Sequence, residues 1–160
     1  MPKTNSKLLA KKIIASNNYM VLSSSNSLGV PWICILAYAY DEKYNFYFVS
    51  MNNAKHVKQI KDRLDAAVAI FDSRQLIMKG VGLQIEGKCI KVKDKKNIKE
   101  ALGVIFSRKW PYGIFYEDSK QHFVKLLKKN VYSVFCFTPK RVWINDPNSD
   151  LDQRLEVNLK

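Results

Sequence analysis

Residues 44–72 read YNFYFVS MNNA KHVKQIKDRL DAAVAIFD, and this stretch decides the fold of the chain. Its first and last parts are short runs of β-branched and aromatic residues, which are typical of strands. Between them, Val57, Ile60 and Leu64 recur at helical spacing, while the lysines of the same segment fall on other sides. The pattern therefore predicts a strand, a short polar connection, a helix and a second strand.

The predicted helix begins with two adjacent basic residues, Lys55 and His56. A helix N-terminus presents unpaired backbone N–H groups and a partial positive charge, so it attracts phosphate. Ser50 could add a hydroxyl group, and Asn52 and Asn53 could add side-chain amides. Two solvated basic side chains without a ligand are the simpler alternative. No other part of the sequence looks like a chemical site of comparable quality.

The composition fits a folded domain with an unusual charge. The 160 residues suit a single domain, 1–160, and 47% of them are apolar, which is enough for a hydrophobic core. The formal net charge of +13 is compatible with nucleic acid, anionic lipid or a phosphorylated ligand, and a lysine-rich composition explains it equally well. The apolar runs are too short for a signal peptide or a membrane helix. We expect a soluble, cytoplasmic protein that binds no membrane.

The sequence shows no metal-ligand motif and no catalytic pair. Cys34, Cys89 and Cys136 lie far apart inside apolar strand patterns. We expect three buried free thiols in a reducing compartment, and no metal site. No nucleophile stands beside a base, so the catalytic residues are unknown at this point.

The rest of the chain adds further strands and peripheral helices. The strands are expected at 19–24, 32–40, 81–92, 131–138 and 140–145, and the helices at 7–17, 94–107 and 119–129. Apolar residues change parity around Gly87, because Ile85 and Ile90 fall on opposite faces, and this predicts a bulge. The tail 154–159, RLEVNL, alternates and could add an edge strand. The whole pattern predicts an α+β fold, mainly β, that forms a closed or nearly closed barrel.

Several segments together resemble a known family. They are YMVLSSSNSLGVPWICILAYAYDEKYNFYFVS (19–50), KHVKQIKDRLDAAVAI (55–70), GVGLQIEGKCIKV (80–92) and PKRVWIND (139–146). Their order resembles that of the pyridoxamine 5′-phosphate oxidase-like FMN-binding split barrels. The resemblance covers residues 8–95 and resumes at the last segment, with a helical insert at about 94–130 between the two parts.

The resemblance implies a six-stranded split β-barrel of Greek-key type with peripheral helices. It also implies a homodimer with two FMN sites at the interface and a small-molecule substrate. The residues that match cofactor-binding positions are Cys34, Ile35, Leu36, Val49, Ser50, Lys55, His56, Gln84 and Trp143.

These positions have different implied roles. Ser50, Lys55 and His56 would bind the phosphate, and the backbone of residues 34–36 would lie along the flavin ring. Gln84 would face the ring. Trp143 would approach a flavin from the partner subunit, or would simply be a buried core tryptophan. The dimer contact is expected near residues 105–116, which include Trp110, Tyr112 and Phe115.

The end of the chain departs from the vitamin-synthesising members of the family. It reads DQRLEVNLK, which keeps Arg154 but lacks the histidine of their substrate motif. This departure argues against pyridoxamine phosphate oxidation itself and favours an FMN-dependent oxidoreductase with an unknown small substrate, since the flavin carries the redox chemistry. FAD or a deazaflavin could replace FMN.

Two other classes of function stay open. One is a flavin- or haem-handling protein without turnover. The other is a basic barrel that binds nucleic acid through Tyr38, Tyr40 and Tyr47 with Lys43. The lysines fall mainly on predicted helices rather than along one sheet face, which disfavours nucleic acid.

Overall fold

The computed structural model describes residues 4–76, 80–108, 116–149 and 151–160. The helices within these ranges are α1 (Ser6–Ser16), α2 (Lys55–Asp62), α3 (Lys95–Ser107) and α4 (Tyr116–Lys128). The strands are β1 (Tyr19–Ser25), β2 (Pro31–Ala37), β3 (Ala39–Tyr40), β4 (Phe46–Met51), β5 (Asp65–Phe71), β6 (Gly82–Lys91), β7 (Tyr132–Asn145) and β8 (Arg154–Glu156).

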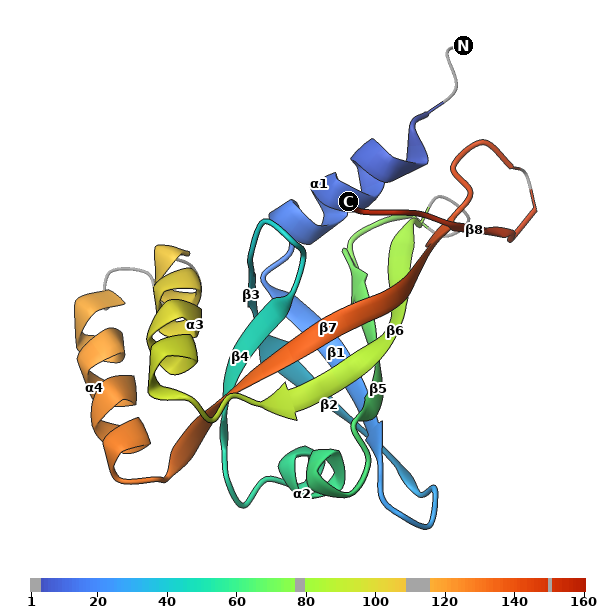
Figure 1. The fold of residues 1–160 in the computed structure, drawn as a ribbon. Helices are drawn as coiled ribbons and strands as arrows, with labels where there is room; N and C mark the ends of the chain where they lie inside the picture. Colours follow the sequence, from blue (N-terminus) through green and yellow to red (C-terminus); the bar gives the residue numbers. More distant parts are fainter. Residues whose placement is uncertain (1–3, 77–79, 109–115, 150) are drawn as a thin grey trace.

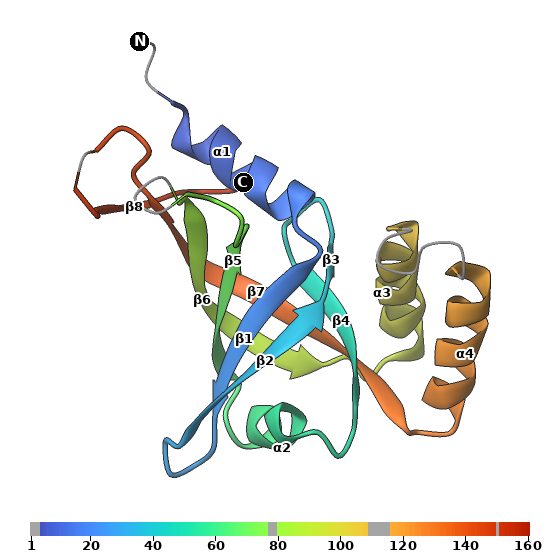
Figure 2. The same ribbon diagram turned by 180° about the vertical axis from the view of Figure 1, so that it is seen from behind.

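The strands form one antiparallel sheet that curls into a barrel (Figures 1 and 2). Its order is β2-β1-β5-β6-β7-β4-β3, and β8, formed by the alternating tail, pairs with β7. β2 and β3 lie at opposite ends of this order, yet only Tyr38 separates them along the chain. The chain between β2 and β3 therefore connects the two edges of the sheet.

The sheet has seven strands along this path, whereas the resemblance implies six. The predicted strand 32–40 divides at Tyr38 into β2 and β3. The N–H of Tyr38 donates to the carbonyl oxygen of Asn18 at 3.2 Å. Its carbonyl oxygen accepts a hydrogen bond from Arg108 Nη1 at 2.9 Å. Both backbone groups of Tyr38 are therefore bonded outside the β2 and β3 ladders.

The barrel is split between β2 and the second half of β4. Among the described residues, β2 has a ladder only with β1, and β4 beyond Tyr47 has a ladder only with β7. α2 lies across this end of the barrel, where it contacts β1, β2 and β6. α1 covers the opposite end and buries Ala10, Ile13 and Ile14.

The barrel interior holds the main hydrophobic core, because alternate strand residues point inward. Its largest members are aromatic, and the rings of Phe48 and Phe135 stack with their centroids 5.3 Å apart. A second core lies outside the barrel, where α3 packs on β3, β4 and β7 through Ala101, Ile105 and Phe106. The predicted dimer contacts Trp110, Tyr112 and Phe115 lie outside the described residues.

The predicted bulge exists, but its extra residue belongs to β7. The register between β6 and β7 shifts at Glu86/Gly87, so that Gly87 pairs with Pro139, Glu86 pairs with Arg141, and Lys140 has no partner. The expected parity change on β6 is wrong, because burial alternates along this strand without interruption. The inward residues change parity on β7 instead, which runs unbroken through Pro139 where two strands were expected.

None of the helices in the described ranges is both long and apolar enough to cross a bilayer.

Candidate functional site

The N-terminus of α2 is the most polar element at the split. Its N-cap residue, Ala54, makes no side-chain capping hydrogen bond, and the first turn carries no acidic residue. The positive end of the helix dipole is therefore not compensated by a side chain. Lys55 is exposed, and its Nζ lies 4.1 Å from the centroid of the Trp32 ring on β2. This contact brings a cation from the chain after β4 to the edge of β2.

His56 and Ser50 are buried and bonded to each other. Each is 7% exposed, and Ser50 Oγ lies 2.7 Å from His56 Nε2. Burial lowers the pKa of His56 below its ordinary value of 6.5, so the imidazole is neutral at neutral pH. The expectation of a second cation beside Lys55 is therefore not met. The pair instead joins the first turn of α2 to the end of β4.

Gln59 is a functional candidate that sequence reasoning missed. Its Oε1 accepts a hydrogen bond from Ser24 Oγ at 2.7 Å, and its Nε2 donates to the carbonyl oxygen of Val30 at 3.1 Å. These bonds tie α2 to β1 and to the residue just before β2. The sequence did contain a signal for a buried polar pair. His56 and Gln59 are polar, lie three positions apart, and share the buried face of α2 with Val57.

The predicted ring-binding stretch lies on the open edge of β2. Cys34 and Leu36 point toward the core, and Ile35 points outward with 72% of its side chain exposed. Burial raises the pKa of Cys34 to about 11, so its thiol is protonated at neutral pH and is a poor nucleophile. Val49, on the other side of the split, packs its side chain into the second core under α3.

Gln84 and Trp143 share an outer face with Ile35 but lie far from it. The strand registers place Ile35, Val21, Ala69, Gln84 and Trp143 in one cross-strand row. Four strand-to-strand steps of roughly 4.8 Å separate the ends of this row, which is about 19 Å measured along the curled sheet. A single subunit therefore brings together Ser50, Lys55, His56 and β2, and leaves Gln84 and Trp143 on the other side of the face.

Polar partners surround these two distant residues. Gln84 Oε1 accepts a hydrogen bond from Arg154 Nε at 2.9 Å. The guanidinium group of Arg141 lies 4.5 Å from the centroid of the Trp143 ring, which is half-buried. Trp143 is therefore a surface residue of this face rather than part of the barrel core.

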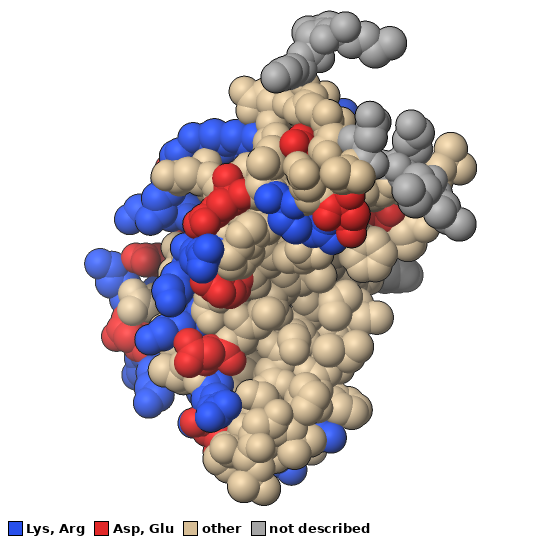
Figure 3. All heavy atoms as spheres, turned by 90° about the vertical axis from the view of Figure 1, so that its right-hand side faces the viewer, with Lys and Arg blue, Asp and Glu red and all other residues tan. Residues whose placement is uncertain are grey.

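Part of the outer barrel surface is free of charge. Figure 3 shows a broad area without Lys, Arg, Asp or Glu over the side of the barrel that faces right in Figure 1. Ile33 on β2 is 65% exposed, and the half-exposed Tyr19 and Phe71 come from β1 and β5. A hollow of about 250 Å³ on this face is lined by Val21 and Trp143, among others. An apolar area of this kind is typical of interaction surfaces.

No protein-family model matches the sequence. No curated protein matches it either.

Solved structures share the fold at low sequence identity. HutZ, the haem storage protein of Vibrio cholerae, is 10% identical, with a TM-score of 0.67 over 87% of this chain and 94% of its own. A pyridoxinephosphate oxidase family protein from Clostridium acetobutylicum is 12% identical, with a TM-score of 0.68 over 96% of this chain and 94% of its own. A haem-binding protein from Mycobacterium smegmatis is 14% identical, with a TM-score of 0.68 over 98% of this chain and 59% of its own. The chain has the split-barrel fold of these proteins.

Proposed function

We propose that this chain binds FMN at the split between β2 and β4 and works, as a homodimer, as a flavin-dependent oxidoreductase on a small substrate. The observation that carries the proposal is the uncapped N-terminus of α2, which holds Lys55 beside β2 at the open part of the barrel. The shared fold with a pyridoxinephosphate oxidase family protein supports the same assignment.

The first turn of α2 would bind the phosphate of the cofactor. A phosphate monoester carries about −1.5 to −2 charge, and each charge-assisted hydrogen bond to it contributes about 1.5–3 kcal/mol. Because His56 is neutral, the positive charge would come from Lys55 and from the helix dipole. Ser50 and His56 would act by fixing the first turn to β4.

The flavin ring would lie along the free edge of β2 at residues 34–36. This edge has no strand partner among the described residues, so its backbone groups are free to bond a ligand. When bound, the flavin supplies the electron-transfer chemistry, and the protein only has to bind it, orient it and tune its potential. This division of labour fits a site whose cysteine is protonated and whose Ser50–His56 pair is buried.

A second copy of the chain would complete the site. Along the curled sheet of one subunit, Gln84 lies about 14 Å and Trp143 about 19 Å from Ile35, and all three belong to one cross-strand row on its outer surface. Packing of two such faces would bury their exposed apolar side chains and would bring Gln84 and Trp143 of one subunit toward β2 of the other.

Haem is the main alternative ligand, since two of the similar structures are haem proteins by description. The sequence has 2 histidines. His56 is bonded to Ser50 through Nε2, and His122 lies on α4, which packs against β7 outside the barrel. Neither position offers an axial ligand at the split, so we favour flavin.

The absorption spectrum of the freshly purified protein tests this proposal, with mass spectrometry of the ligand that heat releases. We expect a flavin spectrum, or its appearance after incubation of the apo-protein with FMN, with about one FMN per chain. Oxidation of a reduced nicotinamide by the loaded protein would separate an oxidoreductase from a flavin store. A haem spectrum, or no flavin retained after incubation, would contradict the proposal.

A further inference from the structure

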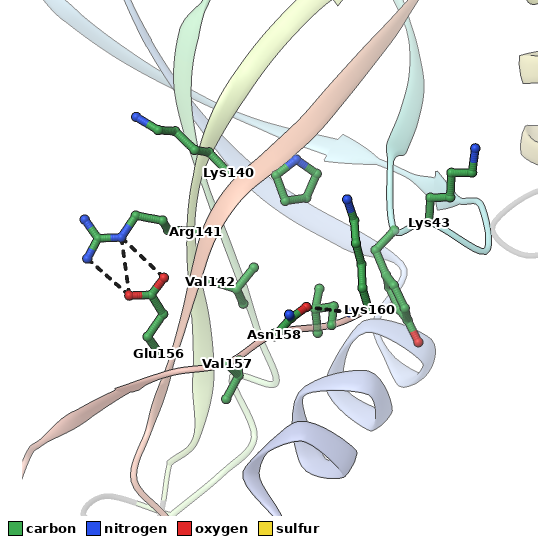
Figure 4. Close-up of a pocket in the computed structure, with 11 residues that line it drawn as sticks. Lys43, Lys140, Arg141, Val142, Glu156, Val157, Asn158 and Lys160 are labelled. Carbon is green, nitrogen blue, oxygen red and sulfur yellow. Dashed lines mark hydrogen bonds and ion pairs between the residues drawn. The ribbon is translucent and has the colours of Figure 1, made fainter.

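A second pocket lies at the other end of β4 from α2, between the β3–β4 turn, the β7 bulge and the C-terminal segment (Figure 4). Its volume is about 570 Å³, within the range of roughly 300–1,000 Å³ that small-molecule sites occupy. Lys43 lies on the turn, Lys140 on the bulge and Lys160 on the C-terminal segment. The three cations therefore come from three different parts of the chain.

The pocket carries an excess of positive charge. Arg141 and Glu156 neutralise each other, with Nη2 and Oε2 3.2 Å apart. Within the described ranges, no carboxylate forms an ion pair with Lys43, Lys140 or Lys160. Lysines that line one hollow without a carboxylate partner give it a positive potential, which favours a bound anion.

Helix α1 adds two more lysines to the same region. Lys7 donates a hydrogen bond from Nζ to the backbone oxygen of Lys160. Lys11 Nζ lies 5.4 Å from the centroid of the Tyr44 ring, and Tyr44 lines the pocket. The positive charge is therefore contributed by four segments of the chain that the fold brings together.

Backbone geometry at the pocket is unusual in two places. Tyr44 has a φ of 59°, a left-handed conformation that is rare for residues other than glycine and asparagine. Its ring stacks on that of Tyr40, with the centroids 5.7 Å apart. Lys140 is the extra residue of the β7 bulge. Backbone outliers and bulges are both over-represented next to ligand sites, where they direct side chains.

We propose that this pocket binds a small organic phosphate with at least two negative charges. Lys43, Lys140 and Lys160 bind its phosphate groups, and the carbon part of the ligand packs against Tyr44 and Val157 at the pocket wall. The site is separate from the α2 site, because the six residues of β4 span about 20 Å between them. The proposal does not depend on flavin binding.

Calorimetric titration with ADP and with inorganic pyrophosphate, at about 0.15 M salt, tests the proposal on the full chain. The pocket pair is the double variant Lys43→Ala/Lys140→Ala. The control pair is the double variant Lys93→Ala/Lys96→Ala, which removes the same charge from exposed lysines outside the pocket. We expect the pocket pair to weaken ADP binding about tenfold or more. The control pair should change it by less than about twofold.

Several results would overturn the proposal. They are equal weakening by both pairs, no binding of either probe at millimolar concentration, or loss of ADP binding in Lys55→Ala, which would assign the phosphate to α2. A single-stranded oligonucleotide that binds more tightly than ADP and is weakened equally by both pairs would indicate general polyanion binding instead. FMN binding should be unchanged in the pocket pair, so failure here is distinguishable from failure of the proposed function.

Discussion

His56 is a basic residue that the fold uses as a neutral one. It is almost fully buried, and its Nε2 pairs with Ser50 Oγ. The sequence identifies the adjacent basic pair at the start of a helix, but it cannot separate an exposed lysine from a buried histidine at neighbouring positions. That difference depends on which side of α2 faces the barrel. The local sequence does not show this, because strands from distant parts of the chain form the barrel there.

The lowered pKa of His56 makes stability depend on pH. In the unfolded chain this histidine protonates near its ordinary value of 6.5, whereas in the folded protein it does so only at lower pH. The unfolded state therefore binds more protons just below pH 6.5, and the free energy of unfolding falls as the pH drops through this window. It levels off once the pH is below the folded-state pKa.

Urea unfolding of the apo-protein between pH 7.5 and pH 5 measures this effect. His56→Gln should lose the part of the slope that lies just below pH 6.5. His122→Gln, at an exposed histidine of α4, is the matched control and should keep it. The same slope in wild type and His56→Gln would show that this histidine does not titrate as the structure implies.

At the scale of elements, the pairing of β6 with β7 shows what the sequence could predict and what it could not. The sequence predicts a bulge near Gly87 and the register does shift there, but the parity change on which the prediction rests does not occur on β6. The strand that carries the extra residue does not follow from the apolar pattern. Pro139 looks like a strand break, yet it is accommodated beside the bulge, where a missing N–H costs little.

The division at Tyr38 was also beyond prediction from local sequence. The carbonyl oxygen of Tyr38 is held by Arg108, which lies 70 positions further along the chain. An uninterrupted apolar run offers no local signal for such a long-range contact. Most other strands and the helices follow their hydrophobic periodicity, because each buries one continuous face.

The bulged pairing of β6 with β7 requires glycine at position 87. A Cβ atom there would lie 2.3 Å from the carbonyl oxygen of Thr138 and 2.7 Å from Cζ of Phe137. We expect Gly87→Ala to lower the free energy of unfolding by about 1–3 kcal/mol, because overpacking forces the two strands apart. Gly103→Ala is the control, since nothing lies within 4 Å of its Cβ position.

Gly103 lies inside α3, where alanine is the better helix former. Its replacement should raise the free energy of unfolding by roughly 0.5–1 kcal/mol. Thermal and urea unfolding of both variants give the comparison. A Gly87→Ala protein as stable as wild type would mean that the two strands do not approach so closely at the bulge.

At the scale of the whole molecule, a strongly basic chain keeps one face without charge. Exposed apolar side chains on this face come from β1, β2 and β5, which no single sequence segment could reveal. Only the strand registers place Ile35, Gln84 and Trp143 in one row. The resemblance to split barrels implied a shared site, but the position of the face depends on the assembled sheet.

The proposed dimer uses this face. We expect light scattering to give a dimer for the wild type and a monomer for Ile35→Lys, because the variant places a charge within an apolar contact. Leu8→Lys changes another exposed aliphatic residue, on α1 and away from this face, and should stay dimeric. A monomeric wild type that holds one flavin per chain would contradict the shared site.

The central claim is that the N-terminus of α2, with Lys55, binds the phosphate of a flavin nucleotide. Its most direct test is a titration of wild type and Lys55→Ala with FMN and with riboflavin, which lacks the phosphate; Lys61→Ala, at the other end of α2, is the matched control. We expect wild type to bind FMN about tenfold or more tightly than riboflavin. We also expect Lys55→Ala to weaken FMN binding alone and Lys61→Ala to weaken the binding of neither ligand. Equal affinity of wild type for the two ligands, or equal weakening of both by Lys55→Ala, would contradict the claim.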